Sequence, residues 1–264
     1  MIEAPLETLA RVRRSALFKR VTYDAYLSDI ADRYPSHTFL RNATQGVYLR
    51  QVDLITQILS SNASPGDVSV LDWGTGKGHI SYLMREAGFN VVSCDAQSDN
   101  TDNSFSQAVP IIEQKVINVV PLPHPYALPF PAEQFDAVLS FGVLEHVPDD
   151  LNSLKEILRV LKPGGILFLF FLPQKYSWTQ RLAHLRGDFY HDRLYTQGRV
   201  RELCALTGFA VGRMWLGQVL PKNGLALPSF LIGAAEFLDR TLTEFTPLRL
   251  IATNIECVLY KPER

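Results

Sequence analysis

The sequence predicts an α/β fold built on a mostly parallel β-sheet that helices cover on both faces. Strand-like and helix-like patterns alternate from residue 68 to residue 172, the order expected for βαβ units. The strand-like runs are apolar throughout, as in strands that are buried on both faces. The chain has 264 residues, of which 47% are hydrophobic and 20% charged, and this suits one large globular domain.

The first βαβ unit is predicted over residues 68–95. VSVLDW (68–73) is a short Val-rich run between turn residues and glycines, so it predicts a buried strand. HISYLMREAGF (79–89) has apolar residues at helical spacing and ends at Gly88, a typical helix-ending residue. NVVSCD (90–95) then predicts the second strand of the sheet.

Three further strands and one helix complete the regular part. VINVVPL (116–122) predicts a third strand that its prolines keep short, and FDAVLSF (135–141) predicts a fourth. DDLNSLKEILRVLKPGG (149–165) predicts a helix with acidic residues at its start and a Lys-Pro-Gly-Gly stop. ILFLFFL (166–172) predicts a central fifth strand.

The pattern is looser outside this region. TQGRVRELCALTGF (196–209) predicts a helix closed by Gly208, and residues 210–218 and 254–262 predict two last strands. Helices are also expected over residues 5–34 and 47–61. The predicted division is as follows: N-terminal helices forming a cap over 1–62, and one domain over 63–264 with substrate-side insertions at 173–195, partly helical, and 217–252, also helical.

Composition excludes several classes of protein. The formal net charge of −1 argues against nucleic-acid binding through a positive field. Cys94, Cys204 and Cys257 lie in apolar runs, which is typical of buried, reduced thiols and favours a cytoplasmic location. No signal peptide is recognised, and the apolar stretch 225–238 is shorter than the ~20 residues of a membrane span. Peripheral contact with a membrane stays open.

The loop VLDWGTGKGHIS (70–81) carries glycines in the pattern G-x-G-x-G. A phosphate-binding P-loop needs Ser or Thr after its lysine, whereas Lys77 is followed by Gly78. The dinucleotide fingerprint is G-x-G-x-x-G, which this loop also lacks. Asp72, two residues before Gly74, would repel a pyrophosphate and attract a cationic group. A cofactor that carries an ammonium or a sulfonium therefore fits better than a nucleotide phosphate.

These residues resemble motif I of the class I S-adenosylmethionine (SAM)-dependent methyltransferases, and the chain looks like a stand-alone small-molecule enzyme of the methyltransferase type 11 kind. Asp95 ends the second strand, 21 residues after Gly74, and ALPFPAEQFDAVLSFGVLEHVPD (127–149) and RVLKPGGILFLF (159–170) are similar to further family motifs. The likeness covers about 105 residues in the right order. It implies a Rossmann-like, seven-stranded, mostly parallel sheet whose last strand is antiparallel.

The resemblance implies SAM as cofactor and a set of residues that hold it. The glycines would let the backbone approach the cofactor, and the helix after Gly78 would face the methionine carboxylate. Asp95 would accept both ribose hydroxyls. His124 stands where family members often carry an acid for the adenine amino group. The full implied set is Asp72, Trp73, Gly74, Thr75, Gly76, Gly78, Asp95, Ala96, His124, Tyr126, Ala127, Ser140 and Phe141.

Methyl transfer to a hydroxyl needs alignment, exclusion of water and a base. His146 follows Glu145 and is expected at the start of the helix after the fourth strand, facing the cofactor cleft; a role in packing alone stays open. Tyr190 and His191 are further catalytic candidates, in a loop that could edge a lid over the acceptor. No His, Asp and Glu set has clear metal-ligand spacing, so no metal is expected.

The resemblance favours a small-molecule acceptor, most simply a hydroxyl of a sugar, a lipid-linked compound or a secondary metabolite. Residues 217–252 include an apolar helical pattern that fits either a packed helix, a dimer surface or a surface for a hydrophobic acceptor. Methylation of protein or RNA, and a non-catalytic SAM-binding protein of the same fold, are the alternatives. The oligomeric state is left as monomer or homodimer.

Overall fold

The computed structural model describes most of the chain, and its side chains except those of residues 229 and 230. The described residues are 24–61, 63–96, 109–187, 191, 193–221 and 227–263. The predicted helix over residues 5–34 therefore falls partly outside them, and Tyr190 lies outside them entirely.

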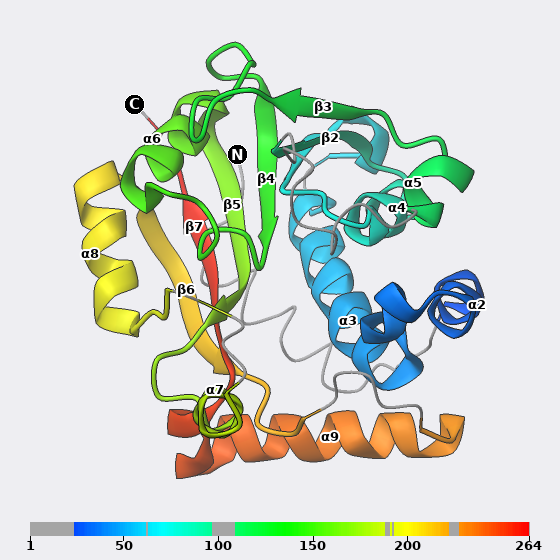
Figure 1. Ribbon diagram of the computed structural model, residues 1–264. Helices are drawn as coiled ribbons and strands as arrows, with labels where there is room; N and C mark the ends of the chain where they lie inside the picture. The colour runs from blue at the N-terminus through cyan, green and yellow to red at the C-terminus, as the bar shows by residue number, and fades with distance from the viewer. Residues whose placement is uncertain are drawn as a thin grey trace.

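The described part of the chain forms a seven-stranded sheet in the order β3-β2-β1-β4-β5-β7-β6 (Figure 1). Its strands are β1 (Ser69–Trp73), β2 (Asn90–Ala96), β3 (Val119–Leu122), β4 (Phe135–Phe141), β5 (Leu161–Pro173), β6 (Ala210–Gly217) and β7 (Asn254–Tyr260). The pairs among β1 to β5 are parallel, whereas β7 runs antiparallel to both β5 and β6. The predicted mostly parallel sheet with an antiparallel last strand is confirmed.

Helices cover both faces of this sheet. They are α2 (Ala25–Arg33), α3 (Asn42–Leu59), α4 (His79–Glu86), α5 (Pro110–Gln114), α6 (Asp150–Val160), α7 (Trp178–Leu185), α8 (Gln197–Thr207) and α9 (Ser229–Phe245), with short 3-10 turns η1 (Pro35–Leu40), η2 (Pro65–Asp67) and η3 (Pro247–Ile251). Figure 1 shows α3 and α4 on one side of the strands and α6 and α8 on the other.

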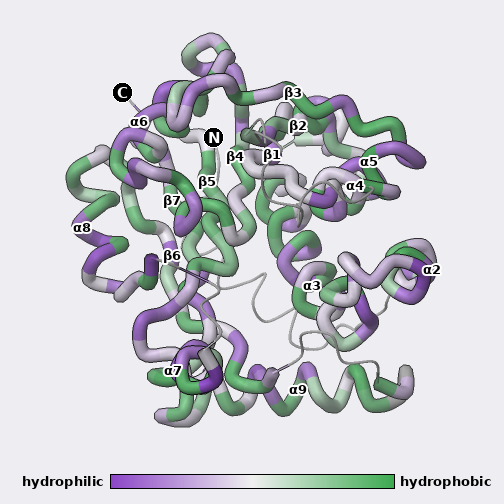
Figure 2. The backbone as a smooth tube through the Cα atoms, in the orientation of Figure 1, coloured by the Kyte–Doolittle hydropathy of each residue, from purple (hydrophilic) through white to green (hydrophobic). Residues whose placement is uncertain are grey.

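Two hydrophobic cores result, because successive side chains of a strand point to opposite faces. Val70 and Phe168 pack on the α3 and α4 side, and Leu71 and Leu167 pack on the α6 and α8 side. The central strands are accordingly apolar along their length (Figure 2). Leu27 of α2 belongs to the same core as β1, so the described N-terminal helices pack directly on the sheet.

Three predicted boundaries differ from the structure. The helix expected over 47–61 begins earlier, at Asn42. The tract expected to stop the helix at 162–165 belongs to β5 instead. Helix α6 begins only at Asp150, because the Asp149 side chain caps it by accepting a hydrogen bond from Asn152 N. His146 therefore lies in the turn before α6 and not at the start of a helix.

The parallel strands end at one common edge, and this edge positions the site. The loops after β1, β2 and β4 all leave the sheet there, as do the segments that lead from β5 to α7 and from β6 to α9. Helix α9 runs across this end of the molecule, beyond the end of β6 (Figure 1). In open α/β sheets, ligands bind at the carboxyl ends of the strands, so the candidate site is sought at this edge.

Candidate active site

The glycine loop joins β1 to α4 and is held by backbone hydrogen bonds. Gly74 N and Thr75 N both donate to Cys94 O of β2, at 2.9 and 3.1 Å. The glycines at 74, 76 and 78 have φ values of +75°, +53° and +83°, which side chains other than glycine rarely adopt. The turn is therefore defined by its glycines and by its attachment to the neighbouring strand.

The three glycines are needed for different reasons. A Cβ on Gly74 would lie 2.5 Å from the Val143 side chain, and one on Gly78 would lie 2.8 Å from Ile112. A Cβ on Gly76 would meet little, since its nearest neighbour is Gly74 O at 3.9 Å. The prediction that all three make room for a cofactor is therefore corrected. Gly74 and Gly78 make room for protein side chains, and only Gly76 borders open space.

Asp72 is buried beneath this loop. Ser81 Oγ of α4 donates to its Oδ2 at 2.5 Å and is itself 2.7 Å from Ser93 Oγ of β2. Burial raises the pKa of Asp72 to about 6. The carboxylate thus joins β1, β2 and the start of α4, and a nearby cationic group would favour its ionised form. Its contact with a cofactor ammonium stays a prediction.

Asp95 lies at the tip of β2, directly beside the glycine loop. Its Oδ2 accepts from Gly76 N at 2.5 Å, and its Oδ1 accepts from Ala96 N at 2.7 Å. Burial raises its pKa, although these backbone donors oppose the rise. A carboxylate has about four acceptor positions, so two amide contacts leave capacity for a pair of hydroxyls.

Two residues of the predicted set turn their side chains away from this space. Trp73 is buried in the core on the α6 and α8 side of the sheet. Thr75 is also buried, and its Oγ1 donates to Asp72 O at 3.1 Å. Both residues can therefore contribute only backbone atoms to a cofactor. Ala96, by contrast, is exposed next to Asp95.

His124 follows β3 and has a local role. Its Nδ1 accepts from Ala127 N at 3.0 Å and from Tyr126 N at 3.3 Å, and its ring lies edge-on to that of Tyr126. The lone pair that could accept from an adenine amino group is thus already used. In the neutral ring the proton is then on Nε2, which is a donor. His124 and Tyr126 remain adenine-side predictions, with His124 now expected to donate.

The end of β4 supplies Ser140 and Phe141. Ser140 is fully buried, and its Oγ has no hydrogen-bond partner among the described residues. The Phe141 ring contacts Phe171 of β5 at 5.9 Å between centroids, and Phe171 contacts Tyr48 of α3 at 5.0 Å. An aromatic wall therefore runs from β4 to α3 at the edge where the site is expected.

A cluster of Glu145, His146 and His191 lies directly after β4. Glu145 Oε1 is 3.9 Å from His146 Nε2 and 3.8 Å from His191 Nδ1, and the two imidazole rings are 5.5 Å apart. The Glu145 side chain is 1% exposed, whereas that of His146 is 58% exposed. Burial raises the pKa of Glu145 to about 7. Two of the three predicted catalytic residues are thus neighbours.

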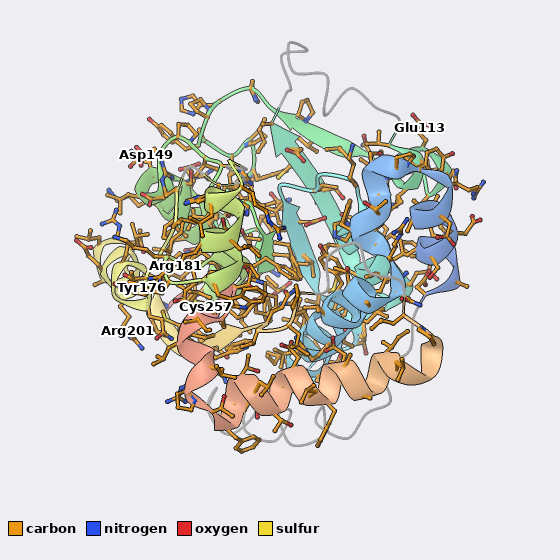
Figure 3. The ribbon with its side chains drawn as sticks, turned by 60° about the horizontal axis from the view of Figure 1, so that its bottom comes forward. Glu113, Asp149, Tyr176, Arg181, Arg201 and Cys257 are labelled. Atoms are coloured by element: carbon orange, nitrogen blue, oxygen red, sulfur yellow. The ribbon has the colours of Figure 1, made fainter. Side chains whose placement is uncertain are left out.

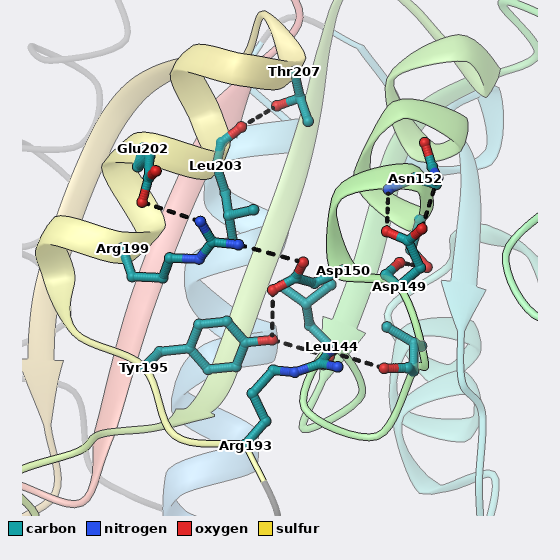
Figure 4. Close-up of polar contacts among 12 residues, drawn as sticks. Leu144, Asp149, Asp150, Asn152, Arg193, Tyr195, Arg199, Glu202, Leu203 and Thr207 are labelled. Atoms are coloured by element: carbon teal, nitrogen blue, oxygen red, sulfur yellow. Dashed lines mark hydrogen bonds and ion pairs between the residues drawn. The ribbon is translucent and has the colours of Figure 1, made fainter.

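The segment after His191 is anchored to the turn before α6 (Figure 4). Arg193 donates to Val147 O at 2.8 Å and to Pro148 O at 3.2 Å. The Tyr195 hydroxyl donates to Leu144 O at 3.2 Å. These contacts bring His191 to Glu145, although 46 positions separate the two residues in the chain.

The sequence analysis missed Glu145 as a functional residue. Its only local signal was an acidic residue within the otherwise apolar run GVLEHVP (142–148). The same cluster also corrects the expectation that no set of residues could hold a metal. The possible ligand atoms of Glu145, His146 and His191 lie within 4.8 Å of one another. Spacing along the chain could not reveal this, because His191 comes from a distant segment.

A pocket of about 450 Å³ lies between α3, β6 and α9, beyond the aromatic wall. Glu256 of β7 lines it, and its Oε2 accepts from Gln51 Nε2 at 3.0 Å and from Phe171 N at 3.1 Å. Burial raises the pKa of Glu256 to about 8. None of the predicted cofactor residues lines this pocket.

The chemistry of the strand edge fits SAM. Helix α4 has no side-chain cap at Gly78, so its first-turn N–H groups can face a carboxylate. Asp95 suits a hydroxyl pair, and the unpartnered Ser140 Oγ offers a further polar contact. Gly76 leaves the space between them open. Backbone amides, Asp95 and Ser140 are therefore the groups that would hold the cofactor.

The three buried thiols of Cys94, Cys204 and Cys257 are free, as predicted. Across the described residues, no helix combines the length and the apolar character needed to cross a bilayer.

Comparison with known proteins agrees with this geometry. Residues 71–169 match the family model of the methyltransferase domain. The ubiquinone biosynthesis O-methyltransferase of Caulobacter vibrioides is 36% identical over 103 residues, which cover 39% of this chain and 40% of that protein. A probable SAM-dependent methyltransferase of Mycolicibacterium smegmatis is 27% identical over 169 residues, 64% of this chain and 62% of its own. The chain thus matches less than two thirds of the length of these relatives.

Among solved structures, that of the cyclase SpnF covers 99% of this chain and 95% of its own, with a TM-score of 0.54 at 16% identity. This is a likeness of fold. Together with the glycine loop and Asp95, these comparisons lead to one conclusion: residues 71–169 are a class I SAM-dependent methyltransferase domain, in a chain that has the fold of this family.

Proposed function

We propose that this protein transfers the methyl group of SAM to a hydroxyl of a small, hydrophobic or lipid-linked acceptor. The observation that carries the proposal is the cluster of Glu145, His146 and His191 at the end of β4. Val143, in the same turn, packs directly on Gly74 of the glycine loop, so the cluster and the cofactor loop are adjacent. A base is thus available beside the expected methyl group.

The reaction needs few groups from the protein. When bound, SAM supplies an electrophilic methyl group on its sulfonium and leaves as S-adenosylhomocysteine. The acceptor oxygen forms the new bond to carbon as its proton passes to a histidine of the cluster. The protein must hold the hydroxyl in line with the methyl group and exclude water.

His146 is the more accessible of the two histidines and is the proposed base. Its Nε2 faces Glu145, whose buried carboxyl would stabilise the imidazolium that forms. His191 approaches the same carboxyl oxygen from the other side and would orient it. Tyr190 stays a candidate outside the described residues.

A hydrophobic acceptor is supported by two features. The aromatic wall of Phe141, Phe171 and Tyr48 borders the site, and these three side chains keep partial exposure. The printed name of the Caulobacter relative concerns ubiquinone biosynthesis, and quinone precursors combine a ring hydroxyl with a greasy tail. The choice among quinone, glycan and other hydroxyl acceptors belongs to the experiment.

The test uses labelled SAM with prenylated catechols and with a lipid extract as acceptors, and counts label in the organic phase. His146→Ala is expected to lose turnover by about 10²- to 10⁴-fold while keeping its affinity for S-adenosylhomocysteine. His184→Ala, an exposed histidine on α7, is the matched control and should keep full turnover. Retained turnover in His146→Ala would rule out the base.

The other outcomes separate the alternatives. Label in a protease- or nuclease-sensitive fraction would favour a protein or RNA acceptor. Binding of S-adenosylhomocysteine with no label in any fraction would favour a non-catalytic protein or other chemistry on this fold. A failure to bind S-adenosylhomocysteine would overturn the proposed cofactor site itself.

A further inference from the structure

Helix α9 is inverted with respect to an ordinary surface helix. Its buried face carries polar side chains: Glu236 pairs with Arg50 of α3 at 2.5 Å, and Asp239 accepts from Val219 N and Leu220 N at 2.8 Å. Its outer face carries large apolar side chains, including Phe237 and Phe245, which are 66% and 74% exposed. The polar anchors bind α9 to the protein and leave the apolar face without a protein partner among the described residues.

The apolar face continues onto neighbouring segments. Leu231 and Leu238 share it on α9, and η3 adds Leu248, Leu250 and Ile251. Helix α7 adds Leu182 and Leu185, the latter 85% exposed, and Tyr176 precedes it. Figure 3 looks onto this end of the molecule, where side chains of α7 and α9 point outward and Tyr176 and Arg181 are labelled. We call the exposed apolar residues of α7, α9, η3 and Tyr176 the apolar end face.

Most large apolar side chains exposed in the described structure gather here. Only Val116, Leu206 and Val211 lie on other elements. A monomeric soluble protein seldom exposes a contiguous apolar patch of this extent without using it.

Positive charge surrounds the apolar end face. Lys175, Arg181, Arg186 and Arg249 are exposed on its segments. Within residues 174–187 and 227–252 the described structure has no fully exposed acidic side chain, and Glu244 is partly exposed. The whole chain has a formal net charge of −1, so this local excess of cations is a property of the end face.

The end face also lies at the edge where the proposed reaction takes place. Helix α7 follows β5 and α9 follows β6, so both leave the sheet at the end where the glycine loop and Glu145 lie. Both helices fall outside the matched methyltransferase domain, which ends at residue 169. They are additions to the domain that border its substrate side.

We propose that the apolar end face docks onto an anionic lipid bilayer. Exposed Phe and Leu side chains would enter the boundary between headgroups and acyl chains, and the basic side chains would contact anionic headgroups. The proposed function enters at one point, because docking would place the acceptor edge at the membrane, where a lipid-linked hydroxyl is found. A second copy of the chain fits less well, since a symmetric dimer through this face would bring the same cations together.

The test measures binding of the full chain to vesicles by flotation. Vesicles of phosphatidylcholine mixed equally with phosphatidylglycerol are expected to carry the protein, and pure phosphatidylcholine vesicles are expected to carry much less. The triple variant Leu185→Ser, Phe237→Ser, Phe245→Ser should partition at least about tenfold more weakly. Arg181→Glu and Arg249→Glu should each lower binding to the anionic vesicles about fivefold or more.

Leu206→Ser, on α8, is the matched control and should bind as the unmodified chain does. Each variant is checked for thermal unfolding and for S-adenosylhomocysteine affinity, which should not change because the substituted side chains are exposed. Vesicle binding that is absent, or equal in the triple variant, would overturn docking and leave the proposed function standing. Sedimentation that gives a dimer broken by Phe237→Ser would instead assign the face to a second copy.

Discussion

The two sides of the strand edge are built by different kinds of contact. On the cofactor side, Gly74, Thr75 and Asp95 are close in the chain and are held by backbone hydrogen bonds between β1 and β2. On the acceptor side, Glu145 and His191 are distant in the chain and meet through side chains. The first side is a preorganised binding cradle, and the second is an assembly that later segments complete.

This difference predicts how the two sides respond to substitution. Changes on the cofactor side should alter the stability of the loop and the affinity for S-adenosylhomocysteine. Changes on the acceptor side should alter turnover and leave that affinity intact. The following experiments would break or sharpen this division.

The largest effect is expected from Gly74→Ala. The new Cβ would collide with Val143, and φ of +75° is strained for alanine, so unfolding should become easier by about 2–5 kcal/mol. Thermal unfolding measures this. Gly66→Ala, where a Cβ meets nothing within 4 Å, is the control. Val143→Ala added to Gly74→Ala should recover part of the loss, and no recovery would mean that the collision is not the cause.

Asp95→Ala should come next. Loss of a charge-assisted pair of hydrogen bonds to the ribose is expected to cost ~2–4 kcal/mol, or about 30- to 1000-fold in affinity for S-adenosylhomocysteine. Titration calorimetry measures it, with the exposed Asp67 changed to alanine as the control. Unchanged affinity in Asp95→Ala would remove this residue from the cofactor site.

Glu256 should make stability depend on pH. Its pKa is raised by burial from 4.5 to about 8, so the folded chain binds its proton more tightly than the unfolded chain. The resulting stabilisation is complete below pH 4.5 and is lost as the pH rises through about 8. Glu256→Gln should remove roughly 1–3 kcal/mol of that dependence. Parallel unfolding curves against pH for both proteins would contradict the buried, protonated carboxyl.

Arg193→Ala should have the smallest of these effects. It would release the His191 segment from Val147 and Pro148 and lower turnover about tenfold, without a change in S-adenosylhomocysteine affinity. Arg201→Ala, an exposed arginine on α8, is the control. If Arg193→Ala weakened cofactor binding as Asp95→Ala does, the proposed division between the two sides would be wrong.

The cofactor side could be predicted from the sequence because its constraints are local. Left-handed backbone at Gly74 and the carboxylate of Asp95 leave a pattern that is readable within a few residues of each strand end. The reasons behind that pattern were not readable: Val143 and Ile112, not a cofactor, exclude a Cβ at two of the three glycines. The role of His124 was also hidden, since it depends on the turn that returns Tyr126 and Ala127 to its ring.

The sequence by itself determined the order of strands and helices, the class of fold and the family of the central domain, because burial imposes a period on each element and the glycine loop imposes residue types. Only the tertiary structure decided that His191 joins Glu145 and His146, that His146 lies in a turn and that α9 buries its acids and exposes its phenylalanines. Helical spacing reveals that a helix has an apolar face, and what that face meets is decided by the rest of the chain.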